Sequence, residues 1–307
     1  FIIRREMTTY QFKKLTEVYV DTGNGPFRID VTADISFGQT FTDKTYAQKT
    51  IHEQFKLHEA SNIKKANPAN FKFTIPYLQQ AVTQSLLDLL VDFKSNTYTL
   101  NTFTLYFVVD DDTMYKIENC VITNGTFIIE KLENLKITLS GEGTELTKQD
   151  ATNMTRSTIT TRTHQLIERL EIEVDDIPLT SSVYNATVEL QNEITWVPYG
   201  TVQESLSVTN ASTSIYPSKF TLNKRTLSGS ISQYVTSDFN SDLLQWKKGI
   251  NILIKAGTAA GSFKGFKFDL SQCTFTNRIT PAEVYAQTYD WRMNDNPADL
   301  GTKITLT

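Results

Sequence analysis

Apolar and polar residues alternate along residues 29–37, which are Ile-Asp-Val-Thr-Ala-Asp-Ile-Ser-Phe. Alternation with a period of two places successive side chains on opposite faces of a strand. One face of the expected strand is therefore apolar, and the other face holds Asp30, Thr32, Asp34 and Ser36. The pattern predicts a half-buried strand with one polar face.

The following segment, residues 38–70, has no such period and carries scattered Lys, His and Glu. A loop of this length is uncommon inside a compact domain, so we expect it to act between molecules. Alternation resumes at residues 71–76. From Leu78 to Phe93 the apolar residues recur at three- and four-residue spacing, which predicts an amphipathic helix.

Shorter alternating runs predict strands at residues 103–109, 115–123, 127–130 and 135–140. Two groups of turn-forming residues separate these runs, Asp110-Asp111-Asp112 and Asn124-Gly125. The glycines of residues 140–144 match neither a phosphate-binding loop nor a dinucleotide fingerprint. They predict another turn.

The rest of the chain repeats this order of strand, long loop, strand, helix and hairpins. The polar loop spans residues 197–219 and a short helix is expected at residues 241–246. The expected strands lie at residues 165–174, 184–196, 226–234, 250–255, 263–275 and 282–291. Cys120 and Cys273 also lie in matching surroundings, Ile-Glu-Asn-Cys-Val-Ile-Thr-Asn and Leu-Ser-Gln-Cys-Thr-Phe-Thr-Asn. We therefore predict two tandem modules, residues 1–154 and 164–307, joined by a Thr- and Ser-rich linker at 155–163.

The polar face of the expected strand at residues 29–37 has a counterpart in the second module. There, the strand at residues 184–196 places Asn185, Thr187, Glu189 and Gln191 on one side. Neither set contains Lys or Arg. An exposed sheet face is the plain interpretation, but in a ring such a face can line a channel.

Composition agrees with a mainly β chain long enough for two domains: 307 residues, 39% hydrophobic and 11% aromatic. A net charge of −4 leaves no basic footprint for sequence-specific nucleic-acid binding. The two cysteines occupy separate modules, so we expect free, buried thiols. No apolar run is long enough to span a bilayer, and we expect no membrane partner.

Candidate chemistry is sparse. His52-Glu53 and His58-Glu59 could supply metal ligands, but the two histidines are too far apart to share one helix face as in a zincin. His164 is the remaining histidine, and no Gly-x-Ser-x-Gly elbow supports a catalytic triad. Asp110-Asp111-Asp112 could hold calcium, although a water-facing hairpin tip is the preferred interpretation. We expect neither an enzyme nor a cofactor.

Several stretches resemble bacteriophage tail tube proteins. In the first module these are Ile117-Glu118-Asn119-Cys120, Gly125-Thr126-Phe127-Ile128-Ile129-Glu130, and residues 135–143, Leu-Lys-Ile-Thr-Leu-Ser-Gly-Glu-Gly. In the second they are residues 186–196, Ala-Thr-Val-Glu-Leu-Gln-Asn-Glu-Ile-Thr-Trp, and residues 225–230, Arg-Thr-Leu-Ser-Gly-Ser. The second module is similar to the tandem-domain version found in some long flexible tails.

The resemblance implies two β-sandwich or half-barrel modules, each with one flanking helix, whose inner strands join those of neighbouring chains around a lumen. Three chains would then imitate a hexameric ring, and stacked rings would form a tube in the virion tail, assembled in the host cytoplasm. The implied partners are further copies, a tape-measure protein, tail terminator and distal tail proteins, and passing double-stranded DNA. No enzymatic activity is implied.

Site residues follow from this interpretation. We expect the lumen to be lined by Asp30, Thr32, Asp34, Ser36, Asn185, Thr187, Glu189 and Gln191. We expect contacts between rings from Lys44, Lys49, Glu53, Lys56, Glu59, Tyr199 and Glu204. An acidic or neutral wall would let DNA slide, because a basic wall binds phosphates strongly.

Two alternatives remain open at this point. The inner tube of a contractile injection device shares the module, although it is usually a single-domain hexamer. A carbohydrate-binding or adhesive β-sandwich would be expected to present aromatic side chains on a groove.

Overall fold

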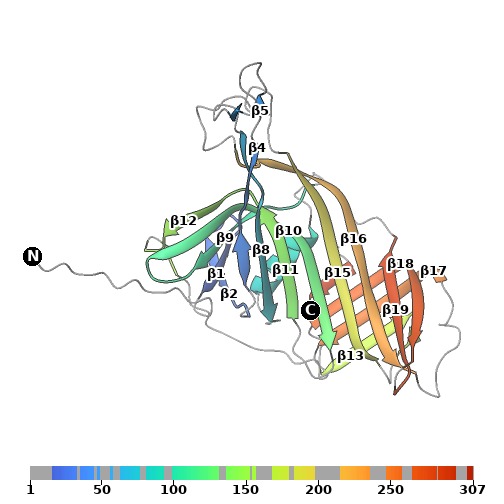
Figure 1. Ribbon diagram of the computed structural model, residues 1–307. Coiled ribbons are helices and arrows are strands. Elements are labelled where there is room, and N and C mark those ends of the chain that lie inside the picture. Colours follow the sequence, from blue (N-terminus) through green and yellow to red (C-terminus); the bar gives the residue numbers. More distant parts are fainter. Residues whose placement is uncertain are drawn as a thin grey trace, which may run out of the picture.

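The computed structural model describes residues 16–32, 35–44, 47–48, 56–57, 63–76, 81–92, 99–130, 136–152, 154–156, 168–179, 183–197, 215–235, 247–257, 265–281, 283–294 and 303–306. Its elements are β1 (Glu17–Asp21), β2 (Pro26–Ile29), β3 (Ser36–Gly38), β4 (Phe41–Lys44), β5 (Ala47–Gln48), β6 (Lys56–Leu57), β7 (Ile63–Ala66), β8 (Ala69–Pro76), α1 (Ala81–Val91), β9 (Phe103–Val108), β10 (Thr113–Glu130), β11 (Lys136–Gly143), β12 (Leu146–Asp150), β13 (Arg169–Val174), β14 (Ile177–Pro178), β15 (Val183–Val197), β16 (Lys219–Tyr234), β17 (Lys247–Gly257), β18 (Gly265–Thr280), β19 (Ala286–Met293) and β20 (Ile304–Leu306). The mainly β prediction is confirmed (Figure 1).

The strands of the first half follow the order β2-β1-β9-β10-β11-β8-β3, with β12 beside β10. Strand β10 is long enough to serve two layers. Its first part pairs with β9 and β12, and its second part pairs with β11. The strands of the second half follow the order β14-β13-β17-β18-β19-β16-β15, with β20 beside β18. The two halves therefore have the same sequence of strand pairings.

The two halves are joined by the antiparallel pairing of β10 with β15, from Asn124 opposite Gln191 to Glu130 opposite Asn185. This pairing places β10 of the first half next to β15 of the second. In Figure 1, β11, β10, β15 and β16 lie side by side in one sheet, and β13, β17 and β18 cross behind them.

An irregularity recurs at the same place in β10 and β18. Asn119 and Gln272 both have positive φ, at 47° and 56°, a conformation that is uncommon for residues other than glycine. Each precedes a buried free cysteine, Cys120 or Cys273, and each lies where the strand register shifts. Burial raises the pKa of the Cys120 thiol well above its usual value. The expectation of free, buried thiols is confirmed.

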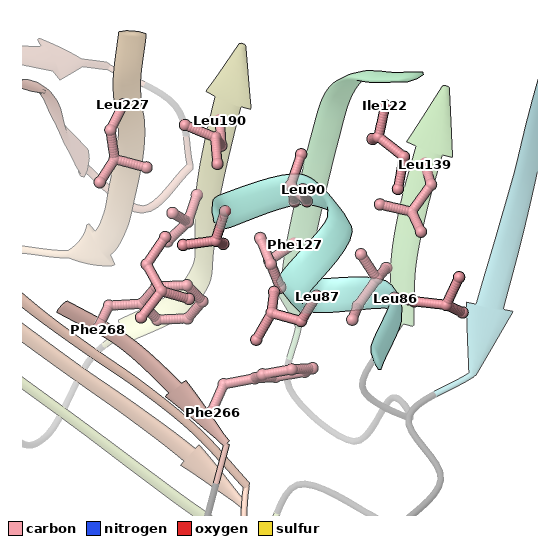
Figure 2. Packing of buried hydrophobic residues seen from close by; sticks show 14 of the residues in the cluster. Leu86, Leu87, Leu90, Ile122, Phe127, Leu139, Leu190, Leu227, Phe266 and Phe268 are labelled. Atoms are coloured by element: carbon pink, nitrogen blue, oxygen red, sulfur yellow. The ribbon is translucent and has the colours of Figure 1, made fainter. Parts of the chain in front are cut away.

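One hydrophobic cluster includes residues from both halves. The rings of Phe127 and Phe268 meet edge to face with centroids 5.1 Å apart, and Phe266 contacts Phe127 in the same way. Figure 2 shows Leu87 and Leu90 of α1 pointing into this cluster. The expected helix at residues 78–93 is confirmed for Ala81–Val91.

The expected single strand at residues 29–37 is wrong. Its ends belong to β2 and β3, and the described residues between them are not in a strand. Ile29 pairs with Val18 in the layer of β1, whereas Phe37 pairs with Phe71 of β8. The chain changes layers here, and an alternating pattern alone does not distinguish this from one continuous strand.

Two predicted turns are also wrong. Asn124-Gly125 lies inside β10, and residues 140–143 lie inside β11. A Cβ atom at Gly125 would collide with Leu90 of α1, so the glycine provides room for the helix. The segment at residues 38–70 contains strands rather than a structureless loop, since β4 pairs with β7 and β5 with β6. The expected helix at residues 241–246 and most of the linker lie outside the described residues.

Candidate functional site

The side of the sheet opposite the core forms a polar face, defined here by the outward-pointing residues of seven adjacent strands and β3. Strand pairing places these residues in rows that cross the sheet. The polar side chains of this face are Ser36, Lys72, Thr74, Asn124, Thr126, Glu130, Lys136, Thr138, Ser140, Asn185, Thr187, Glu189, Gln191, Thr226, Ser228, Ser230, Ser232, Thr274, Thr276, Arg278, Thr280, Thr288, Asp290 and Arg292. The exposed Ile128 lies among them, between Lys136 and Thr187.

Side-chain hydrogen bonds link neighbouring strands across the polar face. The hydroxyl oxygens of Thr187 and Ser230 are 2.8 Å apart. Equivalent hydroxyl pairs join Thr74 to Thr138 at 3.0 Å and Ser232 to Thr288 at 3.1 Å. Such cross-strand pairs fix the side chains and stabilise the register. The result is a wide surface of short hydroxyl groups.

Two amide side chains tie the halves together on this face. Asn124 Nδ2 donates to Glu189 Oε1 at 3.2 Å, and Asn185 Nδ2 donates to Glu130 Oε1 at 3.2 Å. Both bonds run between β10 and β15 and are exposed. The carboxylates of this face therefore have defined partners at the junction of the halves.

The charge of the polar face is mixed. The expectation that it excludes basic residues holds for β15, but adjacent strands contribute basic side chains to the same side of the sheet. These are Lys72, Lys136, Arg278 and Arg292. The acidic residues Glu130, Glu189 and Asp290 are close to balancing them in number. The acidic interpretation was incomplete because it considered one strand in each half.

Five of the eight predicted lumen residues belong to the polar face. Asn185, Thr187, Glu189 and Gln191 share the polar face of β15. Ser36 belongs to β3 at the far end of the strand order, opposite Lys72.

The other members of the first-half set lie elsewhere or cannot be placed. Asp30 and Thr32 lie between β2 and β3, where the Thr32 N–H donates to the carbonyl oxygen of Thr74 at 2.8 Å. Asp34 lies outside the described residues. The structure therefore groups the second-half residues but does not align Asp30, Thr32 and Ser36 along one strand.

Strands β4 to β7 form an arm, defined here as residues 41–66, that projects beyond the sheet (Figure 1). Of the residues expected between rings, Lys44 ends β4 and Lys56 begins β6. Lys49, Glu53, Glu59, Tyr199 and Glu204 lie outside the described residues. The arm base also contacts the end of the second long segment: Ala66 N donates to Ile215 O at 2.9 Å, and the rings of Phe41 and Tyr216 meet edge to face.

Gln39 anchors the arm base to the sheet, a role that the sequence pattern did not indicate. Its Nε2 donates to the carbonyl oxygens of Asn67 and Thr144, at 2.9 and 3.0 Å. Its Oε1 accepts a hydrogen bond from the N–H of Leu146 at 2.9 Å. One amide thus satisfies three backbone groups and connects the arm to the start of β12.

Arg225 is a second residue that sequence reasoning missed. Its buried guanidinium donates to Asn192 Oδ1 and to the carbonyl oxygen of Val91, both at 2.7 Å. These bonds link β15 and β16 to the carboxyl end of α1. Burial lowers the pKa of Arg225 to about 10, and the nearby Asp92 opposes this shift. The guanidinium therefore stays charged at neutral pH and connects the two halves.

The described residues give no support to a metal centre. They contain no group of three or more His, Cys, Asp or Glu side chains placed to hold a metal ion. The tip at residues 110–112 has partners of its own: Asp110 Oδ1 accepts from the N–H of Thr113, and Asp111 pairs with Arg156 at 2.8 Å. The histidine pairs at residues 52–53 and 58–59 lie outside the described residues. Among the described helical residues, no helix is long and apolar enough to cross a membrane.

Comparison with known families gives one finding. Residues 8–304 match the family described as the Bacteriophage Baseplate Tube Protein Family. A comparison with curated proteins finds no match.

Proposed function

Because the chain belongs to the bacteriophage baseplate tube protein family, we propose that three copies close into one ring of a tube and that the polar face lines its channel. Membership makes the chain a structural component of a phage tail or baseplate that assembles with further copies of itself. The resemblance to phage tube proteins is thereby confirmed. Its narrower form, the main tube of a long flexible tail, stays a prediction.

The repeated order of strand pairings is the observation that carries this proposal. Both halves follow the same order of pairings, from β2 to β3 in the first half and from β14 to β15 in the second. Two similar units in one chain allow a closed ring of sixfold appearance to form from three chains. We therefore propose that the modules at residues 1–154 and 164–307 are tandem copies of one tube fold.

The chemistry of the polar face supports a role as a channel wall. Double-stranded DNA carries about one negative charge per 1.7 Å, and clustered Lys and Arg would hold it by counterion release. Here basic side chains such as Lys136 and Arg292 share the face with Glu189 and Asp290. Hydroxyl groups separate them. Such a wall gives DNA no continuous basic track to bind.

The arm supports contacts between stacked rings. It projects from one end of the sheet and is held at its base by Gln39. Its base also contacts the second long segment through Ala66 and Ile215. We propose that the arm and residues 197–219 reach the next ring. The tape-measure, tail terminator and distal tail proteins are the further partners that a tube would require, and passage of DNA to the host is its proposed task.

Mass measurement of assembled rings tests the proposal. Purified protein viewed by negative-stain microscopy should form rings or tubes, and the rings should contain three chains. Six chains per ring would overturn the tandem-copy argument while leaving a tube. Dispersed monomers that bind glycans would instead support the adhesive alternative.

The arm has a separate test. Replacement of residues 45–62 by Asn-Gly keeps the pairing of β4 with β7 and closes it with a two-residue turn. Rings of this variant should form but should not stack. Long tubes from the variant would show that the arm has another task.

A further inference from the structure

We propose that the edge of β18 at residues 276–280 pairs with β3 of the next copy in the ring, with Ile279 opposite Phe37. This inference rests on the proposed ring and names the surfaces that close it. The partner is a second copy of this chain, because the chain already contains a version of the same junction between its two halves.

The internal junction is the template. Strand β15 pairs with β10 along the edge of β10 that is not occupied by β11. In this junction Phe127 lies opposite Val188, and Ile128 lies opposite Thr187. In the strand order of the two halves, β18 holds the position of β10, and β3 holds the position of β15. The same strand pairing can therefore form between β18 of one copy and β3 of another.

Two rows of paired residues define the correspondence between the halves. A row is a set of residues that lie opposite one another on four adjacent strands. These strands are β3, β8, β11 and β10 in the first half and their counterparts β15, β16, β19 and β18 in the second. The first row consists of Phe37, Phe71, Gly141 and Ile122. The second row consists of Val188, Gly229, Trp291 and Phe275. Phe37 therefore occupies the place of Val188, and Ser36 the place of Thr187.

The same rows identify the counterpart of Phe127. Phe127 lies opposite Ile137 of β11, and Ile279 lies opposite Gln287 of β19. Ile137 and Gln287 are equally far along their strands from the two rows. Strand β10 contains one extra residue at a bulge before Asn124, and this insertion accounts for the difference in numbering. Ile279 thus corresponds to Phe127.

Exposure differs sharply between these two equivalent residues. Phe127 is fully buried against Phe266 and Phe268 at the internal junction. Ile279 is 44% exposed, and Val284 and Tyr285 of the adjoining hairpin are 54% and 58% exposed. An apolar group that is covered at one junction and open at its counterpart indicates a surface covered by another molecule.

The receiving surface has matching chemistry. Phe37 and Tyr115 are half-buried, and their ring centroids are 5.3 Å apart. Tyr115 lies opposite Phe107 of β9, as Phe268 lies opposite Ile254 of β17. Tyr115 therefore takes the place of Phe268 at the internal junction. Ile279 would pack on Phe37 and Tyr115 of the next copy.

Both edges have room for a partner strand. Within the part of the chain that the structure describes, the strand paired with β3 is β8, and the strand paired with the part of β18 that follows Phe275 is β19. Exposed edges of this kind favour uncontrolled pairing unless another strand covers them. Closing each edge of one copy with the opposite edge of the next generates a ring.

A cysteine pair tests the register. In the proposed junction Thr280 lies opposite Ser36, as Ile128 lies opposite Thr187 internally. Both side chains are exposed within one chain, so the double variant Ser36→Cys with Thr280→Cys should fold. The two positions are separated by seven strand-to-strand steps in the chain, about 34 Å along the sheet at about 4.8 Å per step, so a link within one chain is excluded. Cys120 and Cys273 are buried and should not react.

The matched control is Ser36→Cys with Thr276→Cys. Thr276 is exposed on the same strand, roughly 13 Å from position 280 at about 3.3 Å per residue. Oxidation, or a short bis-maleimide that tolerates imperfect geometry, should link the first pair into a ladder that ends at covalent trimers. The control pair should remain unlinked.

Microscopy of the same samples separates the two levels of inference. Tubes without a link between positions 36 and 280 would overturn this junction and leave the tube intact. Equal linking of both pairs would also overturn the register. If the unmodified protein forms no rings and the first pair gives no link, both the junction and the proposed function are wrong.

Discussion

A Cβ atom on Gly229 would lie 2.6 Å from Cζ2 of Trp291, because the indole lies across the glycine from the neighbouring strand. The first half has the same relationship with the strands exchanged, since Phe71 of β8 lies across Gly141 of β11. An aromatic ring over a cross-strand glycine fills the space that a side chain would otherwise occupy. The two halves thus place a glycine–aromatic pair on equivalent strands. The strand that carries the glycine in one half carries the aromatic residue in the other.

Gly229→Ala should therefore destabilise the chain. The added methyl would collide with both the indole and the carbonyl oxygen of Thr187. Overpacking of this kind costs about 1–3 kcal/mol. Denaturant unfolding measures the loss, and Gly38→Ala is the control because its Cβ would have its nearest neighbour at 3.9 Å. Equal stability of the two variants would mean that Trp291 does not hold this position.

Arg225 is expected to stabilise the contact between the halves. Arg225→Ala would leave Asn192 Oδ1 and the carbonyl oxygen of Val91 without this buried donor. Leaving buried acceptors without a hydrogen bond costs about 1–3 kcal/mol, and Arg225→Lys should recover part of it because lysine keeps the charge but not the fork of donors. The neighbouring exposed Lys224→Ala serves as control in the same unfolding experiment. A loss no greater than that of the control would exclude this role.

Alkaline pH should weaken the fold through Tyr289. Burial raises the pKa of Tyr289 to about 12, whereas an unfolded tyrosine has a pKa of about 10. Between these values the unfolded chain loses its proton and the folded chain keeps it, so the free energy of unfolding falls as pH rises, by up to about 1.4 kcal/mol per pH unit. This contribution is fully present below about pH 10.

Tyr289→Phe removes one titrating group and should reduce the slope of this part of the pH profile, while Tyr19, whose pKa burial also raises to about 12, keeps its own contribution. At neutral pH the variant should lose about 1 kcal/mol, because Gln233 Nε2 donates to the phenol oxygen at 2.8 Å. Tyr285→Phe serves as the control, because it removes the hydroxyl of an exposed tyrosine. Identical slopes for Tyr289→Phe and wild type would place the alkaline loss at other groups.

The local sequence pattern was sufficient to predict an element where each of its faces stays buried or exposed along its whole length. The alternation at residues 184–196 predicted β15 because its two faces stay polar and apolar throughout most of the strand. The three- and four-residue spacing predicted α1 because Leu86, Leu89 and Leu90 all face the core. In both cases the side-chain period itself carries the information.

Glycine was misleading because its role depends on a partner distant in sequence. Asn124-Gly125 is a common hairpin turn, yet Gly125 lies in a strand beneath Leu90. Gly141 likewise lies beneath Phe71. No local pattern identifies those partners. The arm was missed for a related reason, since short paired strands such as β5 and β6 are too brief to show a period.

The polar face required strand order as well as pattern. Glu189 was found from its own strand, but Arg292 joins the same row only through the pairing of β15 with β16 and of β16 with β19. Charge balance across a sheet therefore could not be inferred from one strand in each half. This affects how the channel hypothesis is tested, because a substitution changes a mixed surface rather than an acidic one.

Glu189→Lys tests whether the polar face is a channel wall. The substitution replaces an acidic group with lysine in the row that contains Arg292 and beside the row that contains Lys136, so each ring would gain a basic cluster on the path of the DNA. Assembly should persist, since the core face is unchanged and the lost bond from Asn124 is exposed. DNA ejection from particles carrying the variant should slow at low salt and recover as salt rises, because phosphate binding by lysine releases counterions.

Asp269→Lys is the matched control for that experiment. Asp269 is exposed on the first part of β18, in the layer that crosses behind the polar face, so the same charge change there should not meet the DNA. Ejection rates are compared across a salt series, with the substitutions verified in the purified particles. Slowing by Glu189→Lys alone would assign the channel wall to the polar face. Equal rates for both variants at low salt would place Glu189 away from the DNA, and equal slowing of both would indicate a general effect of charge on the particle.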